Sequence, residues 1–185
     1  MQPRTPRRPA DDQGSLRADD AAGLSAELAA TVAGARRRAV RDGDRQIDTA
    51  HLLHSLLESD PEVRALVGDA PRLARLLGYL VQRSIGYGLR WQGSVEDSGA
   101  VAAMTAAVAY GDGARDAGGW SPVAAAALED ARARALRRGA ERADGIDLFA
   151  AIVGDPRSRA VEVLERAGVA TRQLALRAEA TRSIP

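Results

Sequence analysis

The chain has 185 residues and a hydrophobic fraction of 45%, enough to bury one ordinary core or two small fused ones. Its 26 basic and 25 acidic residues nearly cancel, so no overall field attracts nucleic acid or an anionic membrane. It has no cysteine, which excludes disulfides and thiolate sites and fits a cytoplasmic location. It has no lysine either, which excludes a P-loop nucleotide site.

Aromatic residues supply only 3% of the chain, so Ala, Val and Leu must build most of the core. Because strands favour β-branched and aromatic residues, this composition predicts closely packed helices and an all-α fold. No stretch of about 18 apolar residues occurs, so we expect no membrane-spanning helix. Residues 1–22 carry arginines without an apolar stretch behind them, which predicts a disordered tail and not a secretory signal.

From residue 24 the apolar residues follow a helical period. Ser25 is a favourable N-cap, and Gly43 supplies the left-handed residue that commonly ends a helix. Asp48 or Thr49 can cap a second helix, and Asp60-Pro61 ends that helix and begins a third. The apolar positions of the first two helices are Leu28, Val32, Ala35 and Ala39, then Leu52, Leu53, Leu56 and Leu57.

A second copy of this pattern follows at an offset of 96 residues. The aligned pairs include Ser25 with Ser121, Arg36 with Arg132, Gly43 with Gly139, Leu52 with Leu148 and Leu56 with Ile152. The second copy predicts a third helix from Asp155-Pro156 that carries Val161, Val163 and Leu164 and ends at Gly168. A fourth helix, capped by Thr171, then carries Leu174 and Leu176.

Each copy has more apolar surface than its own helices can hide, so the two must pack together. We therefore predict a tandem pseudo-two-fold repeat of two four-helix units in one all-α domain. The expected boundaries are 23–83 for the first repeat, 84–119 for a linker and 120–182 for the second repeat. Glycines at both ends mark the linker, in which a short helix over Val101–Val108 is a candidate. A linker of this length, with Tyr87, Trp91 and Tyr110 in it, is either functional or partly disordered, and the sequence leaves both open.

Both histidines, His51 and His54, lie three residues apart on the second helix, and Glu58 is a potential third metal ligand. The second copy keeps this helix without either histidine. We therefore favour a structural role, with His51 satisfied by backbone at the helix start. We predict no metal, no cofactor and no catalytic residue, because the spacing supports no Ser-His-Asp constellation.

Arginines cluster at 36–45 and 132–142 in both copies. They suit solvated helix ends, where positive charge complements the helix dipole, more than a nucleic-acid surface. Trp91 and Trp120 have two interpretations that the sequence leaves open, since a tryptophan can fill a core gap or anchor a protein interface.

The stretch "GDRQIDTAHLLHSLL" is similar to the signature of the Clp N-terminal repeat, approximately Gly-His-x-x-Ile-x-Thr-Glu-His-Leu-Leu-x-x-Leu-Leu. The matching residues are Gly43, Ile47, Thr49, His51, Leu52, Leu53, Leu56 and Leu57. "WSP" from Trp120 resembles the aromatic-Thr-Pro start of a family repeat. The resemblance covers residues 24 to about 180.

This resemblance implies a Clp N-type helical domain that binds proteins or peptides and has no enzymatic activity. It implies a stand-alone protein without AAA+ modules, with a Clp unfoldase, its adaptors or its clients as partners. A small cyclic peptide is a further candidate ligand, and no nucleic acid or membrane partner is expected. The alternative function is a DNA-associated regulator that uses the arginine-rich helix ends.

Some members of the resembled family bind phosphoarginine through a hydroxyl at the start of the first helix and a glutamate before the signature histidine. By this resemblance Ser25, Ser121 and Trp120 are the candidate ligand-binding residues. Ala50 and Ile146 replace the two glutamates, and Asp147 replaces the second histidine. We therefore expect ordinary phosphoarginine recognition to be lost.

Overall fold

The computed structural model describes residues 21–44, 46–84 and 119–182. The first repeat contains α2 (Ala26–Asp42), β1 (Gln46–Ile47), α3 (Thr49–Ser59), α4 (Pro61–Val67) and α5 (Ala70–Ser84). The second contains β2 (Gly119–Trp120), α7 (Pro122–Arg137), α8 (Gly145–Gly154), α9 (Arg159–Arg166) and α10 (Thr171–Arg182). The predicted all-α fold is confirmed. The tail over residues 1–20, Trp91 and the expected helix at Val101–Val108 fall outside the described residues.

The helix ends expected from the sequence are present in both repeats. Ser25 Oγ accepts a hydrogen bond from Leu28 N at 3.1 Å, and Ser121 Oγ accepts one from Ala124 N at 3.1 Å. The first helix of each repeat is followed by a glycine in the left-handed region, Gly43 with φ 73° and Gly139 with φ 79°. L-residues with a side chain rarely adopt this backbone conformation, which explains why both repeats use glycine there.

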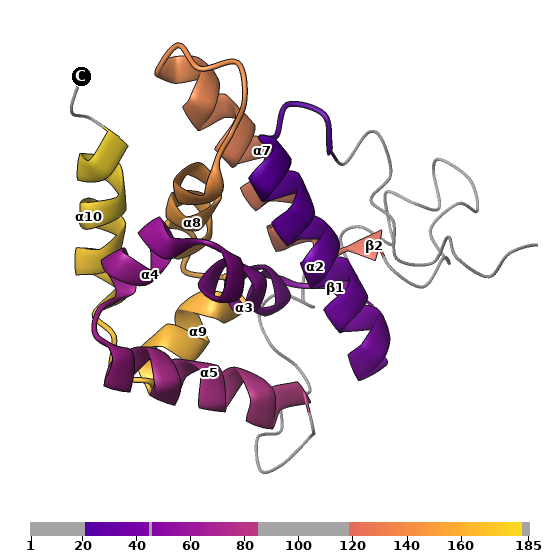
Figure 1. Ribbon diagram of the computed structural model, residues 1–185, viewed down its shortest axis with the longest axis vertical. Helices are drawn as coiled ribbons and strands as arrows, with labels where there is room; N and C mark the ends of the chain where they lie inside the picture. Colours follow the sequence, from indigo (N-terminus) through magenta and orange to yellow (C-terminus); the bar gives the residue numbers. More distant parts are fainter. Residues whose placement is uncertain (1–20, 45, 85–118, 183–185) are drawn as a thin grey trace, which may run out of the picture.

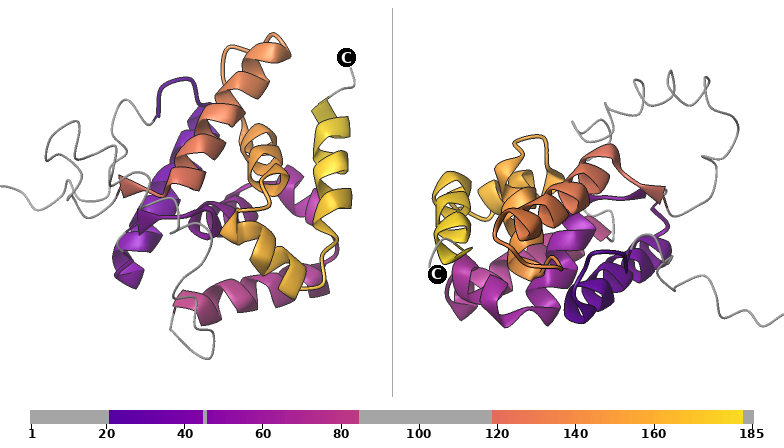
Figure 2. Two further views of the ribbon diagram at one scale, coloured as in Figure 1. Left: turned by 180° about the vertical axis from the view of Figure 1, so that it is seen from behind. Right: turned by 90° about the horizontal axis from the view of Figure 1, so that it is seen from above.

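The second helices, α3 and α8, lie centrally and are surrounded by the other helices (Figures 1 and 2). Residues 49–57 of α3 and 145–153 of α8 are all buried. Each helix begins with a capping box. In it, the aspartate side chain accepts a hydrogen bond from the backbone N–H three residues later, and the side chain of that later residue accepts one from the backbone N–H of the aspartate. The pairs are Asp48 with His51 and Asp144 with Asp147. The third residue of the two boxes differs, histidine in one and aspartate in the other, but the cap has the same arrangement of hydrogen bonds.

Two predicted helix starts in the second repeat are wrong. The third helix begins at Arg159 and not at Pro156, because Asp155 binds the Arg157 side chain and backbone instead of capping a helix. Thr171 is the first residue of α10 and not its cap, and its hydroxyl donates to Glu165 Oε1 at 3.1 Å. Leu174 is buried as expected, whereas Leu176 is 65% exposed.

Two short stretches of parallel β-type pairing connect the two repeats. Ser121 N donates to Ile47 O at 2.9 Å beside the β1–β2 pair, and Ser25 N donates to Ala143 O at 2.8 Å beside an isolated bridge. These two hydrogen bonds map onto each other at the offset of 96 residues. The pseudo-two-fold relation of the repeats remains a prediction, and these matched contacts support it.

A buried polar cluster also connects the repeats. Thr49 Oγ1 accepts a hydrogen bond from Ala160 N at 3.1 Å and lies 3.0 Å from Ser158 Oγ, so α3 caps the start of α9. Beside it, Arg159 Nη1 donates to Asp48 Oδ2 at 2.5 Å. Within the described ranges, none of the helices is both long enough and apolar enough to cross a membrane.

Candidate binding groove

A groove of about 760 Å³ runs along α2, beside the α3–α4 junction, and reaches the start of α8 and the end of α10. Small apolar groups, hydroxyls and charged side chains all contribute to its wall. The lining residues are Ser25, Glu27, Leu28, Ala30, Thr31, Gly34, Arg37, Arg38, Arg41, Ser55, Glu58, Ser59, Asp60, Pro61, Glu62, Asp144, Gly145 and Arg182. The volume falls in the range of sites that hold a small ligand or part of a peptide.

The middle of the groove is made of small residues. Thr31 Oγ1 and Ser59 Oγ lie 2.7 Å apart, and Ser59 Oγ donates to Ser55 O at 2.8 Å. Gly34 stands in the middle of α2, where a Cβ would lie 3.5 Å from Ser55 Oγ. A glycine inside a helix costs about 1 kcal/mol relative to alanine. Its presence here leaves space between α2 and α3.

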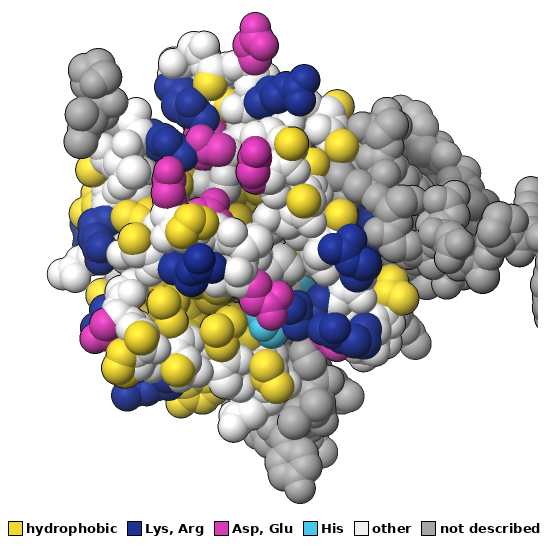
Figure 3. Space-filling view, in the orientation of Figure 1, with side chains coloured by type: hydrophobic (Ala, Val, Ile, Leu, Met, Phe, Trp, Pro, Cys, Tyr) yellow, Lys and Arg dark blue, Asp and Glu magenta, His cyan; other side chains and the backbone are white. Residues whose placement is uncertain are grey.

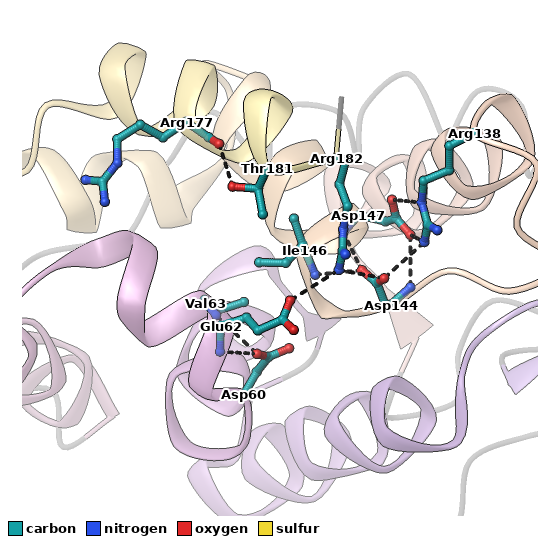
Figure 4. A network of polar contacts seen from close by, with 10 residues as sticks. All are labelled: Asp60, Glu62, Val63, Arg138, Asp144, Ile146, Asp147, Arg177, Thr181 and Arg182. Atoms are coloured by element: carbon teal, nitrogen blue, oxygen red, sulfur yellow. Dashed lines mark hydrogen bonds and ion pairs between the residues drawn. The ribbon is translucent and has the colours of Figure 1, made fainter. Parts of the chain in front are cut away.

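One end of the groove is acidic and contains a network of ion pairs. Figure 4 shows Arg182 between two carboxylates, 2.6 Å from Asp144 Oδ2 and 3.4 Å from Glu62 Oε2. On the other side of Asp144, Arg138 Nη2 lies 3.0 Å from that carboxylate and 2.6 Å from Asp147 Oδ2. The hydrogen bond to Asp147 raises the pKa of Arg138 above its usual value.

Asp60 completes the acidic end. Its Oδ1 accepts hydrogen bonds from the backbone of Glu62 and Val63 at 2.8 and 3.1 Å, which caps α4. Gly145 lets this carboxylate approach α8, because a side-chain methyl group at position 145 would overlap it.

The other end of the groove is basic. Arg38 Nη2 donates to Glu58 Oε2 at 2.6 Å, whereas Arg41 lies 3.7 Å from Asp42 and Arg37 makes no ion pair within the described residues. In Figure 3, arginines gather on the right over the C-terminal half of α2, and acidic side chains gather towards the upper middle of the same face.

A second groove of about 480 Å³ lies between α7 and α8, at the position equivalent to the first. At the offset of 96 residues, Glu27, Gly34 and Ser55 correspond to Val123, Asp130 and Ala151. This groove is therefore more apolar, and its charges pair with each other at 2.7 Å for Arg134–Asp130 and 2.9 Å for Arg157–Asp155. The first groove has more polar groups available to a ligand.

The predicted ligand residues separate in the structure. Ser25 lines the first groove, next to the start of α8 from the other repeat. Ser121 is only 1% exposed, and its oxygen caps α7. Trp120 is half-buried against the core, with the Arg36 guanidinium 5.7 Å from its ring centroid. Of the three, Ser25 has the clearest access to a ligand.

Ala50 and Ile146, which replace the family glutamates, are each 1% exposed and belong to the hydrophobic core. They offer a ligand no charge and almost no accessible surface. The residues that follow them, His51 and Asp147, are also buried and complete the two capping boxes.

His51 is a structural residue at the start of α3. Its Nδ1 accepts a hydrogen bond from Asp48 N at 3.2 Å, and its Nε2 lies 2.9 Å from Asp44 Oδ2. His54 is buried as well, with Nε2 3.4 Å from Glu58 Oε1. Among the described residues, no three His, Cys, Asp or Glu side chains are placed to hold a metal ion.

Acidification is expected to destabilise the protein through His54. Burial, together with the nearby Arg38 charge, lowers the pKa of His54 from 6.5 to about 4, although Glu58 and Asp42 oppose this shift. The unfolded chain therefore binds more protons between pH 4 and 6.5, and stability should fall as the pH drops through that window. Urea unfolding at pH 7 and pH 5 measures this loss, and His54→Gln should reduce it. An equal loss in His54→Gln would show that other groups cause it.

Two features of the groove were not predicted from the sequence: the space at Gly34 and the convergence of Glu62, Asp144 and Arg182. A glycine in the middle of an otherwise good helix was a usable signal. The convergence had no local signal, because these residues come from three distant helices.

No protein family profile and no curated protein matches this sequence. Two solved structures match its fold, each with a TM-score of 0.59 and 13% sequence identity over 86% of this chain. One was described under "Preliminary structural investigations of a malarial protein secretion system" and is 95% covered. The other is the N-terminal domain of the caseinolytic protease associated chaperone ClpD from Arabidopsis thaliana, which is 94% covered. The chain thus has a Clp N-terminal-type fold, as its sequence resemblance implied.

Proposed function

We propose that the chain is a non-enzymatic module that binds a protein or peptide segment in the groove between α2 and α3. The observation that carries this proposal is the groove itself, about 760 Å³ in volume and lined by hydroxyls and by charges of both signs. The Clp N-terminal-type fold supports a link to unfoldases, with a Clp unfoldase, an adaptor or a client as the partner. A small cyclic peptide is a further ligand that a groove of this size can hold.

A role in catalysis finds no support in the geometry of the described histidines and N-cap serines. Ser25 and Ser121 cap helices, and His51 completes a capping box. These side chains are occupied in holding the fold together.

The DNA-binding alternative is less favoured, because many arginines of the two clusters are already paired with acids. Arg38 binds Glu58, Arg134 binds Asp130 and Glu179, and Arg138 binds Asp144 and Asp147. DNA binding would require these ion pairs to break, or the few remaining arginines would have to supply the positive charge that contacts the phosphates.

Fluorescence anisotropy with labelled casein, an unfolded polypeptide, tests the proposal. Gly34→Leu fills the groove and is expected to weaken binding at least about tenfold, while the better helix propensity of leucine protects the fold. Gly78→Leu is the matched control, since Gly78 is exposed on α5 with nothing within 4 Å of a Cβ. The proposal fails if wild type does not bind or if Gly34→Leu binds equally well.

Two further measurements address the alternatives. Binding to a labelled DNA duplex, with affinity falling steeply as salt increases, would favour the DNA-associated function instead. If the partner is the Clp system, an excess of the chain should slow casein degradation by a purified Clp unfoldase and its peptidase, and Gly34→Leu should not. An unchanged rate with wild type would remove the link to Clp proteolysis.

A further inference from the structure

The charge of the α2 stripe that faces the groove changes sign along the helix. Glu27, Thr31, Gly34, Arg38 and Arg41 recur at spacings of four, three, four and three, so they share one face. An acid stands near the first turn of this stripe and arginines stand in its last turns. This order of charges complements the helix dipole, and it also makes one end of the groove negative and the other end positive.

Neighbouring helices strengthen the acidic end. Four carboxylates line it, from Glu27, Asp60, Glu62 and Asp144, together with the guanidinium of Arg182, and Arg138 approaches Asp144 from behind the groove wall at 3.0 Å. Arg182 already places its cation between Glu62 and Asp144, at 3.4 and 2.6 Å. This contact, drawn in Figure 4, demonstrates that the acidic end accommodates a cationic side chain from another segment.

The basic end has positive charge available for a partner. Arg37 is exposed and makes no ion pair within the described part of the chain, and Arg41 has only the 3.7 Å approach to Asp42. Arg38 is held by Glu58, so it contributes less. An anionic group that reaches this end would meet guanidinium groups that are not already neutralised.

The dimensions fit a short extended segment. From Ser25 to Arg41, α2 rises about 24 Å at about 1.5 Å per residue, which an extended peptide of about seven residues covers. The middle of the groove, beside Gly34, favours small side chains.

We propose that this groove selects an extended peptide of about seven residues with a cationic group at the Glu62–Asp144 end and a carboxylate at the Arg37–Arg41 end. The inference rests on the proposed peptide-binding function and specifies the chemistry of its partner. The equivalent groove between α7 and α8 provides a contrast, because its charges are neutralised in the Arg134–Asp130 and Arg157–Asp155 pairs.

Four labelled peptides test the proposal by anisotropy: KKASAEE, KKASAKK, EEASAEE and QQASAQQ. Wild type should bind KKASAEE at least about fivefold more tightly than each of the others, with a preference that shrinks as salt rises. Arg37→Glu should reverse the order and favour KKASAKK over KKASAEE. Arg37 is exposed, so this change should leave the fold intact. Arg75→Glu on α5 makes the same change of charge away from the groove and should keep the wild-type order.

Equal affinity of wild type for the four peptides, or an unchanged preference in Arg37→Glu, would contradict the proposal that the two ends of the groove select opposite charges. Loss of all peptide binding in Gly34→Leu would in that case still support the proposed binding function. If none of the four peptides binds while casein does, the charge selection is wrong. If casein does not bind either, the proposed function also fails.

Discussion

Removal of either partner of the buried Asp48–Arg159 pair is expected to lower the free energy of unfolding by about 3–5 kcal/mol. Asp48 and Arg159 are 3% and 9% exposed, so loss of one leaves the other charge buried without its partner. Asp48 also caps α3, which adds about 1 kcal/mol to the effect of Asp48→Ala. The pair connects the two repeats, so its loss weakens their packing. Urea unfolding followed by circular dichroism measures both variants.

The exposed Arg157–Asp155 pair is the matched control for this prediction. Arg157→Ala should cost less than about 1 kcal/mol, because Arg157 is exposed and solvent screens its ion pair with the partly exposed Asp155. The double variant Asp48→Ala, Arg159→Leu should cost clearly less than the sum of the single changes, since neither charge is then left buried alone. Additive losses, or a loss as small as that of Arg157→Ala, would mean that the pair does not hold the repeats together.

Ile146→Glu, which restores the acid of the resembled family, is expected to destabilise the protein by about 4 kcal/mol or more. Ile146 is 1% exposed in the hydrophobic core, so the change removes apolar contacts and buries a carboxylate. Burial raises the pKa of such a carboxylate, and the loss should be smaller at pH 4 than at pH 7. Urea unfolding at both pH values gives the two losses.

Ile146→Met provides the control and should cost less than about 1.5 kcal/mol, because it keeps an apolar side chain of similar volume. Ala50→Glu should behave like Ile146→Glu, since Ala50 is equally buried. The structural account of these positions would be contradicted if both glutamates were tolerated and the double variant bound free phosphoarginine more tightly than wild type.

The helix caps and core positions were predictable because their signals are local. Ser25, Gly43 and Asp60 act through hydrogen bonds or backbone angles within a few residues, and the leucines of α3 follow a helical period. Comparison of the repeats also indicated that His51 is structural, because the second repeat keeps the helix without either histidine, and the structure shows Asp147 in the equivalent cap.

Features that depend on distant packing were not predictable. The start of α9 is set by Thr49 of the other repeat, which the local Asp155-Pro156 pattern does not indicate. The acidic end of the groove combines Glu62, Asp144 and Arg182 from three helices, and only the fold brings them together. The cap role of Ser121 follows from the local sequence, but its burial, which removes it from contact with a ligand, depends on packing against the first repeat.

An NMR titration of the isotopically labelled protein with KKASAEE locates the binding surface most directly. We expect the largest amide shift changes in residues 25–41 and 55–62, together with residues at the start of α8. Gly34→Leu should suppress these changes, whereas Gly78→Leu should not. Changes concentrated instead in residues 123–134 and 151–157, with α2 unaffected, would contradict the assignment of the groove between α2 and α3 as the peptide-binding site.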